Sequence, residues 1–247
     1  MLWKEIRRKM KSISSILVKF FMLLASGNIW VSQDFDFFYF VQQWPGSFCD
    51  TKQSCCFPLT GKPASNFSIH GLWPNFSNGS YPSNCNSAQN PFDQSKIADL
   101  IPRAETSWPS LSCAGGKKTE SNKTSSNNRR FWKHEWDKHG TCSDSILDQH
   151  AYFKASLDLK DRVDLLQILQ YNGITQDGNL YSVVNITRAI KQAIGFVPGI
   201  TCNTDPFDNR QLSEIYLCVD KSASNFIECP ILPSGKSCTD NVEFPIF

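Results

Sequence analysis

Two stretches of this chain indicate both its fold and its chemistry: Ser68-Ile-His-Gly-Leu-Trp-Pro-Asn75 and Phe131-Trp-Lys-His-Glu-Trp-Asp-Lys-His-Gly-Thr-Cys142. They contain three of the four histidines of the chain, His70, His134 and His139. Imidazole titrates near neutral pH, so one histidine can begin a reaction as a base while another begins it as an acid. A fold that brings the two stretches together would therefore support acid–base chemistry.

The second stretch is predicted to form a helix over 131–139. With about 100° between successive residues, Trp132 and Trp136 fall on one side and can pack into a core. Gly140 is expected at the C′ position, where glycine commonly ends a helix, and Cys142 is expected to hold that end covalently. The arc beside the tryptophans carries the ionisable groups His134, Glu135, Lys138 and His139.

A zinc site and a plain surface helix are the competing interpretations of this segment. Zinc metalloproteases use H-E-x-x-H, with both imidazoles on one helix face. Here His134 and His139 are five residues apart and point about 140° away from each other, so we expect no metal. The pairs at i,i+4 are Glu135 with His139 and His134 with Lys138. This spacing favours a carboxylate that orients or tunes His139 and a cationic pair that faces a phosphate. A salt-bridged surface helix leaves the two tryptophans and the two histidines unexplained.

The amino-terminal segment has the order of a secretory signal, which is basic, then apolar, then small residues. Five basic residues lie within 4–11, and an apolar run covers 13–29. The small residues Ala25, Ser26 and Gly27 lie near the end of that run. A membrane anchor is the alternative, but the run is shorter than the ~20 residues that span a bilayer. We expect residues 1–32 to be a signal peptide, cleaved between Ala25 and Gln33, and 33–247 to form one domain without a membrane segment.

The charge and the cysteines describe the expected mature chain. Six of the 25 basic and one of the 23 acidic residues lie in 1–32, so the remaining 19 and 22 give a net charge of −3. A general polyanion-binding surface is therefore excluded, and a nucleic-acid substrate would need a local cationic site. Ten cysteines without a C-x-x-C pair favour disulfides over zinc. Five Asn-x-Ser/Thr sites, at Asn66, Asn75, Asn78, Asn122 and Asn185, are typical of a secreted glycoprotein.

The periodicity predicts strands and helices without a βαβ rhythm. The expected strands are 34–43, 65–72, 214–220 and 226–229, and the expected helices are 95–105, 131–139, 161–171 and 186–194, the last ended by Gly195. Residues 115–130 are polar and are expected to form a long surface loop. The fold class is therefore expected to be α+β, a single domain with a mainly antiparallel sheet packed by helices and held by disulfides.

The two stretches resemble the active-site segments of the ribonuclease T2 family. The resemblance extends to Gln43-Trp-Pro-Gly-Ser47, Tyr171-Asn-Gly-Ile174, Gly195-Phe-Val-Pro-Gly-Ile200 and Ile215-Tyr-Leu-Cys-Val-Asp220, and the later stretches are similar to the plant S-like extracellular branch. It implies an endoribonuclease that needs no metal or other cofactor and makes a 2′,3′-cyclic phosphate before hydrolysing it. In that family pattern His139 is the general base, His70 the general acid, Glu135 and Lys138 stabilise the transition state, and His134 binds phosphate.

The resemblance also implies base-binding residues and a disulfide pairing. One base site matches Trp73, Asn75 and Tyr81, and a second matches Gln43, Phe48, Ser110, Leu111 and Phe131; for the aromatic rings core packing is the alternative. Phe48 stands where tyrosine is usual, and the loop 115–130 is longer than usual. The implied disulfides are Cys49–Cys55, Cys56–Cys113, Cys85–Cys142, Cys202–Cys238 and Cys218–Cys229.

The expected partner is single-stranded RNA, bound by a secreted, extracellular or vacuolar monomer that does not cleave DNA because the reaction needs the 2′-hydroxyl. Two other functions stay open. A storage or recognition protein on the same scaffold would be expected to lack a catalytic histidine, whereas His70 and His139 are both present. A self-incompatibility ribonuclease would be expected to be basic, which the net charge disfavours.

Overall fold

The computed structural model describes residues 34–113, 127–234 and 237–247. The signal peptide predicted for 1–32 lies outside the described residues, as does most of the predicted loop 115–130. The described residues belong to one compact unit.

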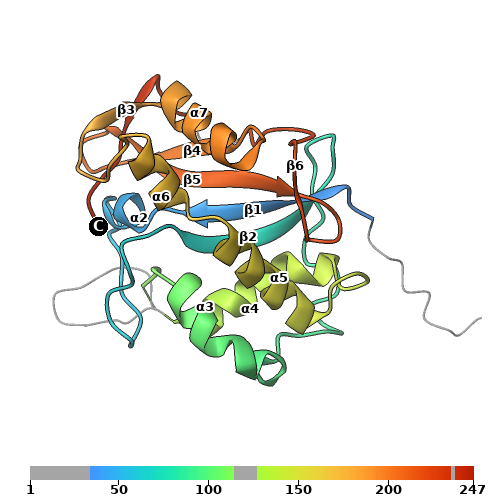
Figure 1. The fold of residues 1–247 in the computed structure, drawn as a ribbon. Helices are drawn as coiled ribbons and strands as arrows, with labels where there is room; N and C mark the ends of the chain where they lie inside the picture. The colour runs from blue at the N-terminus through green and yellow to red at the C-terminus, as the bar shows by residue number, and fades with distance from the viewer. Residues whose placement is uncertain (1–33, 114–126, 235–236) are drawn as a thin grey trace, which may run out of the picture. The chain divides into compact units, whose positions relative to one another are not determined.

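The centre of this unit is a seven-stranded sheet (Figure 1). Its main path runs β2-β1-β5-β7-β3, and β4 and β6 also pair with β5. Every pairing is antiparallel except that of β5 with β7. The strands are β1 (Phe37–Gln43), β2 (Ser68–Asn75), β3 (Leu180–Ser182), β4 (Gly199–Thr204), β5 (Arg210–Val219), β6 (Phe226–Ile227) and β7 (Asn241–Glu243).

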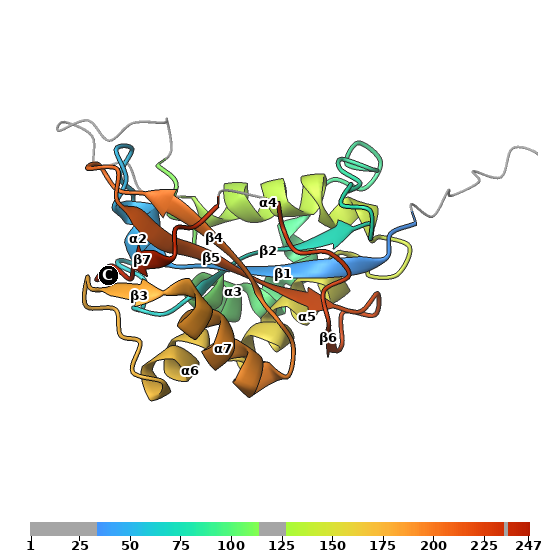
Figure 2. The same ribbon diagram turned by 90° about the horizontal axis from the view of Figure 1, so that it is seen from above.

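Helices cover the sheet unequally. Figure 2 shows α3, α5, α6 and α7 along one side of the sheet and α4 on the other side, beside β2. The helices are α2 (Pro45–Cys49), α3 (Ile101–Ser107), α4 (Asn128–Lys138), α5 (Gln149–Arg162), α6 (Leu165–Tyr171) and α7 (Val183–Ile194), with 3₁₀ turns η1 (Gln94–Leu100) and η2 (Gly140–Cys142). The expected α+β class with a sheet packed by helices is therefore confirmed.

Alternation along β1 divides its side chains between two clusters. Phe38 and Phe40 belong to the main core, together with buried residues of α3 to α7. Phe37, Tyr39 and Val41 belong to a small cluster with Tyr216 and Cys218 of β5. We call the face with this small cluster the site face, because the functional side chains gather beside it.

Several predicted boundaries differ from the observed ones. The strand expected to end before Pro74 continues to Asn75, which is possible because β2 is the last strand on its side, where a missing N–H costs no ladder bond. The helix predicted over 161–171 is the end of α5 followed by α6, separated by Val163 in an extended conformation. The helix before Gly195 ends as predicted, with that glycine left-handed at φ 89°.

The segment 95–105 and the start of α4 also differ from expectation. The single helix predicted over 95–105 is the 3₁₀ turn η1 followed by α3. Pro102 lies in the first turn of α3, where proline is tolerated. Asn127 caps the amino terminus of α4 by accepting the N–H of Arg130, so 127–130 are not loop.

All ten cysteines lie in the described residues and form five disulfides. The pairs are those that the family resemblance implied: Cys49–Cys55, Cys56–Cys113, Cys85–Cys142, Cys202–Cys238 and Cys218–Cys229. The third pair joins the segment before η1 to the end of η2, three residues after His139. It therefore fixes the position at which the second histidine motif ends.

Candidate active site

His70 is the extra residue of a β-bulge in β2. Gly71 pairs with Val41 of β1 and Ile69 pairs with Gln42, so His70 has no partner in the register. Strict alternation would turn His70 to the face opposite Gly71 and Trp73. The bulge changes this, and bulges commonly re-aim side chains beside active sites.

The outer side of β2 is held by two side chains. The indole N–H of Trp108 donates to the carbonyl of His70 at 2.9 Å, and the Tyr152 hydroxyl donates to the carbonyl of Leu72 at 2.8 Å. Both rings are fully buried. The backbone that carries His70 is therefore bonded to β1 on one side and to core aromatics on the other.

Helix α4 places the second motif across from β2. Trp132 and Trp136 are buried in the core, as the helical period predicted. Gly140 follows the cap residue His139 as expected, but it is not among the glycines with positive φ and begins η2. A glycine is required at this position because a Cβ would lie 2.3 Å from the Trp136 ring.

These elements enclose a cavity of about 300 Å³ beside the site face. It contains all five predicted catalytic residues, which come from β2 and from α4 with its cap. The lining residues include His70, His134, Glu135, Lys138 and His139, together with Tyr39, Trp73, Asn75, Tyr81 and Tyr216. The structure therefore brings the two sequence motifs into one site.

Glu135 does not make the contact that its spacing suggested. Its side chain is 1% exposed, accepts the indole N–H of Trp73 at 2.8 Å and lies 3.9 Å from Nε2 of His70. Only the backbone carbonyl of Glu135 bonds to His139, through the amide N–H of the cap residue. The prediction that this carboxylate orients His139 is wrong in the structure, because the helix ends at His139 and the carboxylate is bound by Trp73.

His70 lies between two carboxylates. Its Nδ1 is 2.6 Å from Oε1 of Glu214 on β5, and its Nε2 faces Glu135. Burial alone would lower the pKa of His70, but the hydrogen bond to Glu214 and the charges of both glutamates outweigh it and raise that pKa. The charged imidazolium is therefore favoured at this position.

His139 has the opposite tendency. Burial first, then the charges of Lys138, His70 and His134, lower the pKa of His139 to about 2. Its ring stacks on Trp73, with centroids 5.0 Å apart and planes at 22°. Its Nδ1 is buried with no hydrogen-bond partner in the described part of the chain. The neutral imidazole is favoured here.

The remaining charged groups have distinct environments. Burial raises the pKa of Glu135, against the opposing charge of His70. Partial burial and the charge of Lys138 lower the pKa of His134, which lies on α4 at the cavity. The expected pair of His134 and Lys138 therefore lines the cavity together.

The predicted base-binding residues fall into two groups. Trp73, Asn75 and Tyr81 line the cavity. Tyr81 is 58% exposed, whereas the amide of Asn75 is buried and donates to the carbonyl of Trp73. Of the second set, Phe48 lines a neighbouring cavity and the ring of Phe131 lies 5.9 Å from that of His70. The others, Gln43, Ser110 and Leu111, are buried.

Two site residues were missed by sequence reasoning. Glu214 contacts His70, and the hydroxyl of Tyr216 donates to Glu214 Oε2 at 2.8 Å while its ring lines the cavity. The available signal was the alternation of the strand around 214–220, which places Glu214 and Tyr216 on one face. Nothing in the sequence indicated that this face meets His70.

The described residues contain neither a metal-ligand cluster nor a membrane-spanning helix. In 34–113, 127–234 and 237–247, no group of three or more His, Cys, Asp or Glu side chains is placed to hold a metal ion. Across the same ranges no helix is both long and apolar enough to cross a membrane.

Known proteins match the chain over most of its length. The model of the family described as "Ribonuclease T2 family" matches residues 35–229. Extracellular ribonuclease LE of Solanum lycopersicum is 57% identical over 217 residues, which is 87% of this chain and 89% of that protein. Intracellular ribonuclease LX of the same species is 50% identical over 240 residues, 96% of each chain.

A solved structure supports the same assignment. The crystal structure of RNase NT in complex with 5′-AMP has a TM-score of 0.79 and 50% sequence identity, and the match covers 87% of this chain and all of that one. Its identity is high enough to support more than a shared fold. The resemblance seen in the two motifs is confirmed, and the chain belongs to the ribonuclease T2 family.

Proposed function

We propose that this T2-type endoribonuclease cleaves single-stranded RNA without a metal and with low base specificity. The 2′-hydroxyl attacks the adjacent phosphorus, the 5′-oxygen leaves, and the resulting 2′,3′-cyclic phosphate is hydrolysed to a 3′-phosphate. The observation that carries this proposal is one cavity lined by two histidines with opposite pKa shifts.

The two histidines divide the proton transfers. His139, favoured as the neutral imidazole, takes the proton of the 2′-hydroxyl. His70, favoured as the imidazolium, gives a proton to the departing 5′-oxygen. Hydrolysis of the cyclic phosphate runs in the reverse sense, with His70 taking a proton from water and His139 returning one to the 2′-oxygen.

The other charged groups act on the phosphate and on the acid. Lys138 supplies positive charge to the oxygens on which negative charge builds in the transition state. His134, on the same helix, binds the phosphate. Glu135 stabilises the charged form of His70 and holds Trp73, which is in contact with both catalytic imidazoles.

Base binding relies on the rings at the cavity. Tyr81 is exposed enough to stack a base, and such stacking contributes about 1–3 kcal/mol and tolerates several bases. Trp73 already stacks on His139, so its contribution to base binding would come through its edge or its other face. Phe48 would contribute to the second base site from the neighbouring cavity.

The test is digestion of RNA homopolymers and dinucleotides with a chelator present, with identification of the product ends. Cyclic-phosphate and 3′-phosphate ends are expected for RNA, and no cleavage of DNA. His70→Ala and His139→Ala should each lose activity by at least about a hundredfold. Full activity in either variant would contradict the assignment, and a wild type that cleaves no RNA would favour a storage or recognition role.

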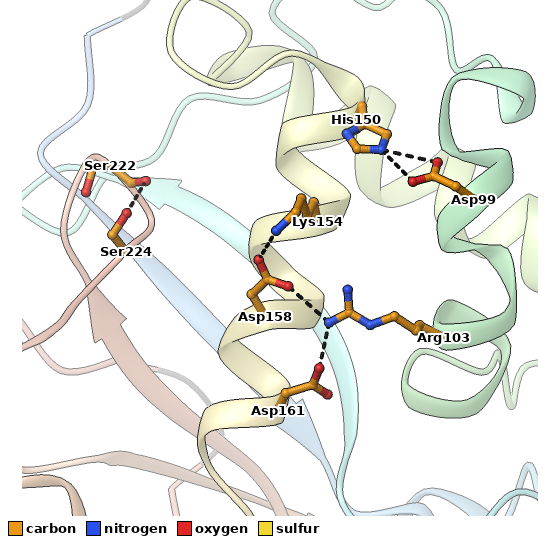
Figure 3. Close-up of polar contacts among 8 residues, drawn as sticks. All are labelled: Asp99, Arg103, His150, Lys154, Asp158, Asp161, Ser222 and Ser224. Carbon is orange, nitrogen blue, oxygen red and sulfur yellow. Dashed lines mark hydrogen bonds and ion pairs between the residues drawn. The ribbon is translucent and has the colours of Figure 1, made fainter.

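The fourth histidine provides a matched control. His150 lies on α5, where its Nε2 is 3.0 Å from an oxygen of Asp99 at the end of η1 (Figure 3). The same figure shows Lys154 and Arg103 bonded to Asp158, so this surface is occupied by ion pairs. His150→Ala is therefore expected to leave cleavage unchanged.

We also propose how the chain is processed and where it acts. Residues 1–32 are removed as a signal peptide, and residues 33–247 act as a secreted monomer, extracellular or vacuolar. The basic-apolar-small order of the segment and the relative named as extracellular support this; another relative is named as intracellular. Amino-terminal sequencing of the protein from culture medium, with its mass in solution, tests both points. Expression confined to the style of the flower would favour the alternative of a self-incompatibility ribonuclease.

A further inference from the structure

Glu214 has no role in the reaction as described so far, yet it makes the shortest contact of His70. Its Oε1 lies 2.6 Å from Nδ1, whereas Glu135 is 3.9 Å from Nε2. The two ring nitrogens therefore have different surroundings. Nδ1 is occupied by a protein carboxylate, and Nε2 lies on the side of Glu135 and the cavity.

The fold produces this contact through a bulge in β2 and through the position of Glu214 on β5. His70 is the extra residue of β2 opposite β1. On β5, Glu214 pairs with Thr201 of β4 while Leu212 pairs with Cys202, so Ser213 is an extra residue directly before Glu214. The bulge in β2 turns His70 toward the site face. Glu214 shares that face with Tyr216 and Cys218 by ordinary alternation, so the two side chains meet across the end of β1.

The second oxygen of Glu214 is also held. Oε2 accepts the hydroxyl of Tyr216 at 2.8 Å and that of Thr201 at 3.3 Å. Burial alone would raise the pKa of Glu214, but the hydrogen bonds from His70, Tyr216 and Thr201 and the charge of His70 lower it. The carboxylate is therefore ionised, oriented by two hydroxyls, and directed at Nδ1.

We infer that Glu214 is a positioning residue that keeps a proton on Nδ1 of His70 and so reserves Nε2 for the proton exchanged with substrate. This inference rests on the proposed function, in which His70 is the acid. In cleavage the Nε2–H bond breaks as the 5′-oxygen gains its proton, and Nδ1–H stays bonded to Glu214. The neutral ring then has its lone pair on Nε2, the state needed to take a proton from water in the second step.

Glu214 exchanges no proton with substrate in this scheme. The other titratable groups that interact with the charge of His70 are Glu135, Lys138 and His134 of α4 and its cap residue His139, and none of them contacts Nδ1 in the described residues. Removal of Glu214 should change the protonation of His70 and the rate of proton transfer, and it should leave substrate binding largely intact.

The test compares Glu214→Gln and Glu214→Ala with Glu228→Gln, an exposed glutamate next to β6 that makes the same change in net charge. kcat and KM are measured on a dinucleotide across the pH range. In Glu214→Gln the amide oxygen can still accept from Nδ1 but the charge is lost, so the alkaline limb should move down by about one pH unit. Glu214→Ala should lower kcat by at least about tenfold with KM within about twofold. Tyr216→Phe should give a smaller shift of the same sign.

A second readout does not depend on turnover. The titration of His70 followed by NMR should show a lower pKa in Glu214→Gln than in the wild type and in Glu228→Gln. Superimposable pH profiles and titrations of all three proteins would overturn the inference. If the wild type cleaves no RNA, the proposed function fails, and the NMR titration alone then decides whether Glu214 sets the protonation of His70.

Discussion

At the scale of single residues, the proposed mechanism makes the pH dependence of cleavage follow from the protonation states of His70 and His139. His70 has a raised pKa, so its acid form is present at low pH and is lost as pH rises through that pKa. His139 has a pKa lowered to about 2, so its base form is present over nearly the whole range. Protonated His70 and neutral His139 therefore occur together at acidic pH, and this pH range extends above the ordinary histidine pKa of about 6.5.

We predict an acidic plateau in kcat/KM that falls by about tenfold per pH unit above the pKa of His70. The measurement is initial rates on a dinucleotide at constant ionic strength. Activity that rises steadily from about pH 5 to about pH 8 would contradict the prediction, because it would mean that the acid group is not His70.

Gly71 is constrained by the site itself. A Cβ at this position would lie 2.2 Å from Glu135 Oε2 and 2.2 Å from Trp73 Nε1. Gly71→Ala should therefore break the hydrogen bond between Trp73 and Glu135. We expect it to cost about 1–3 kcal/mol of stability and to reduce kcat. Thermal unfolding and cleavage rates measure both effects, with Ser65→Ala, at an exposed position before β2, as the control. A variant as stable and active as wild type would show that the site has more room than the structure gives it.

At the scale of elements, features that follow from residue spacing within one helix or strand could be predicted from the sequence. Features that depend on how two elements pack or pair could not. The tryptophan side of α4 and the end of α7 at Gly195 follow from spacing alone. The contact of Glu135 with Trp73 and His70 does not, because it depends on how β2 lies beside α4. The bulge at His70 is a property of two strands together, and alternation read from β2 alone places its side chain on the wrong face.

The same distinction explains why Glu214 was missed, whereas helix α5, which was not predicted before residue 161, was missed for a local reason. Glu214 becomes part of the site only because β5 lies two strands from β2 in the sheet. Helix α5 buries Tyr152, Phe153 and Leu157, but its weak amphipathic pattern was hidden by the stronger leucine spacing of α6. The resemblance to a known family supplied what the local signal lacked, namely the disulfide pairs and the roles of the histidines.

The disulfide Cys85–Cys142 connects stability to the site, because it closes 57 residues and ends three residues after His139. The Cys85→Ala/Cys142→Ala variant should lose about 4 kcal/mol on the loop-entropy model, against about 2 kcal/mol for Cys49→Ala/Cys55→Ala, whose separation is 6. The first variant should also lose specific activity under conditions where it is folded. Denaturant unfolding and cleavage rates are measured for both double variants. Equal losses of stability and of activity in the two variants would contradict the prediction.

At the scale of the whole molecule, we expect RNA to be bound by a local cationic site and not by the general charge of the surface, because the net charge of residues 33–247 is −3. Among the residues that the structure describes, the basic side chains that line the cavity are Lys138, His134 and His70, and we expect these to make the phosphate contacts. We predict that binding of a short RNA weakens only slightly with salt, with a log–log slope of about −1 to −2 for two or three contacts to single-stranded RNA. KM for an oligonucleotide over a range of salt concentrations tests this; a slope steeper than about −4 would mean that an extended basic surface takes part.

The way β2 is capped affects how copies of the protein meet one another. An outermost strand ordinarily offers free backbone groups to a neighbouring molecule and can recruit it into intermolecular pairing. Here the carbonyls of His70 and Leu72 are taken by Trp108 and Tyr152, and Pro74 has no amide hydrogen to offer. The strand that carries the proposed catalytic acid is thereby shielded from edge-to-edge pairing, so we expect concentrated protein not to polymerise through this strand.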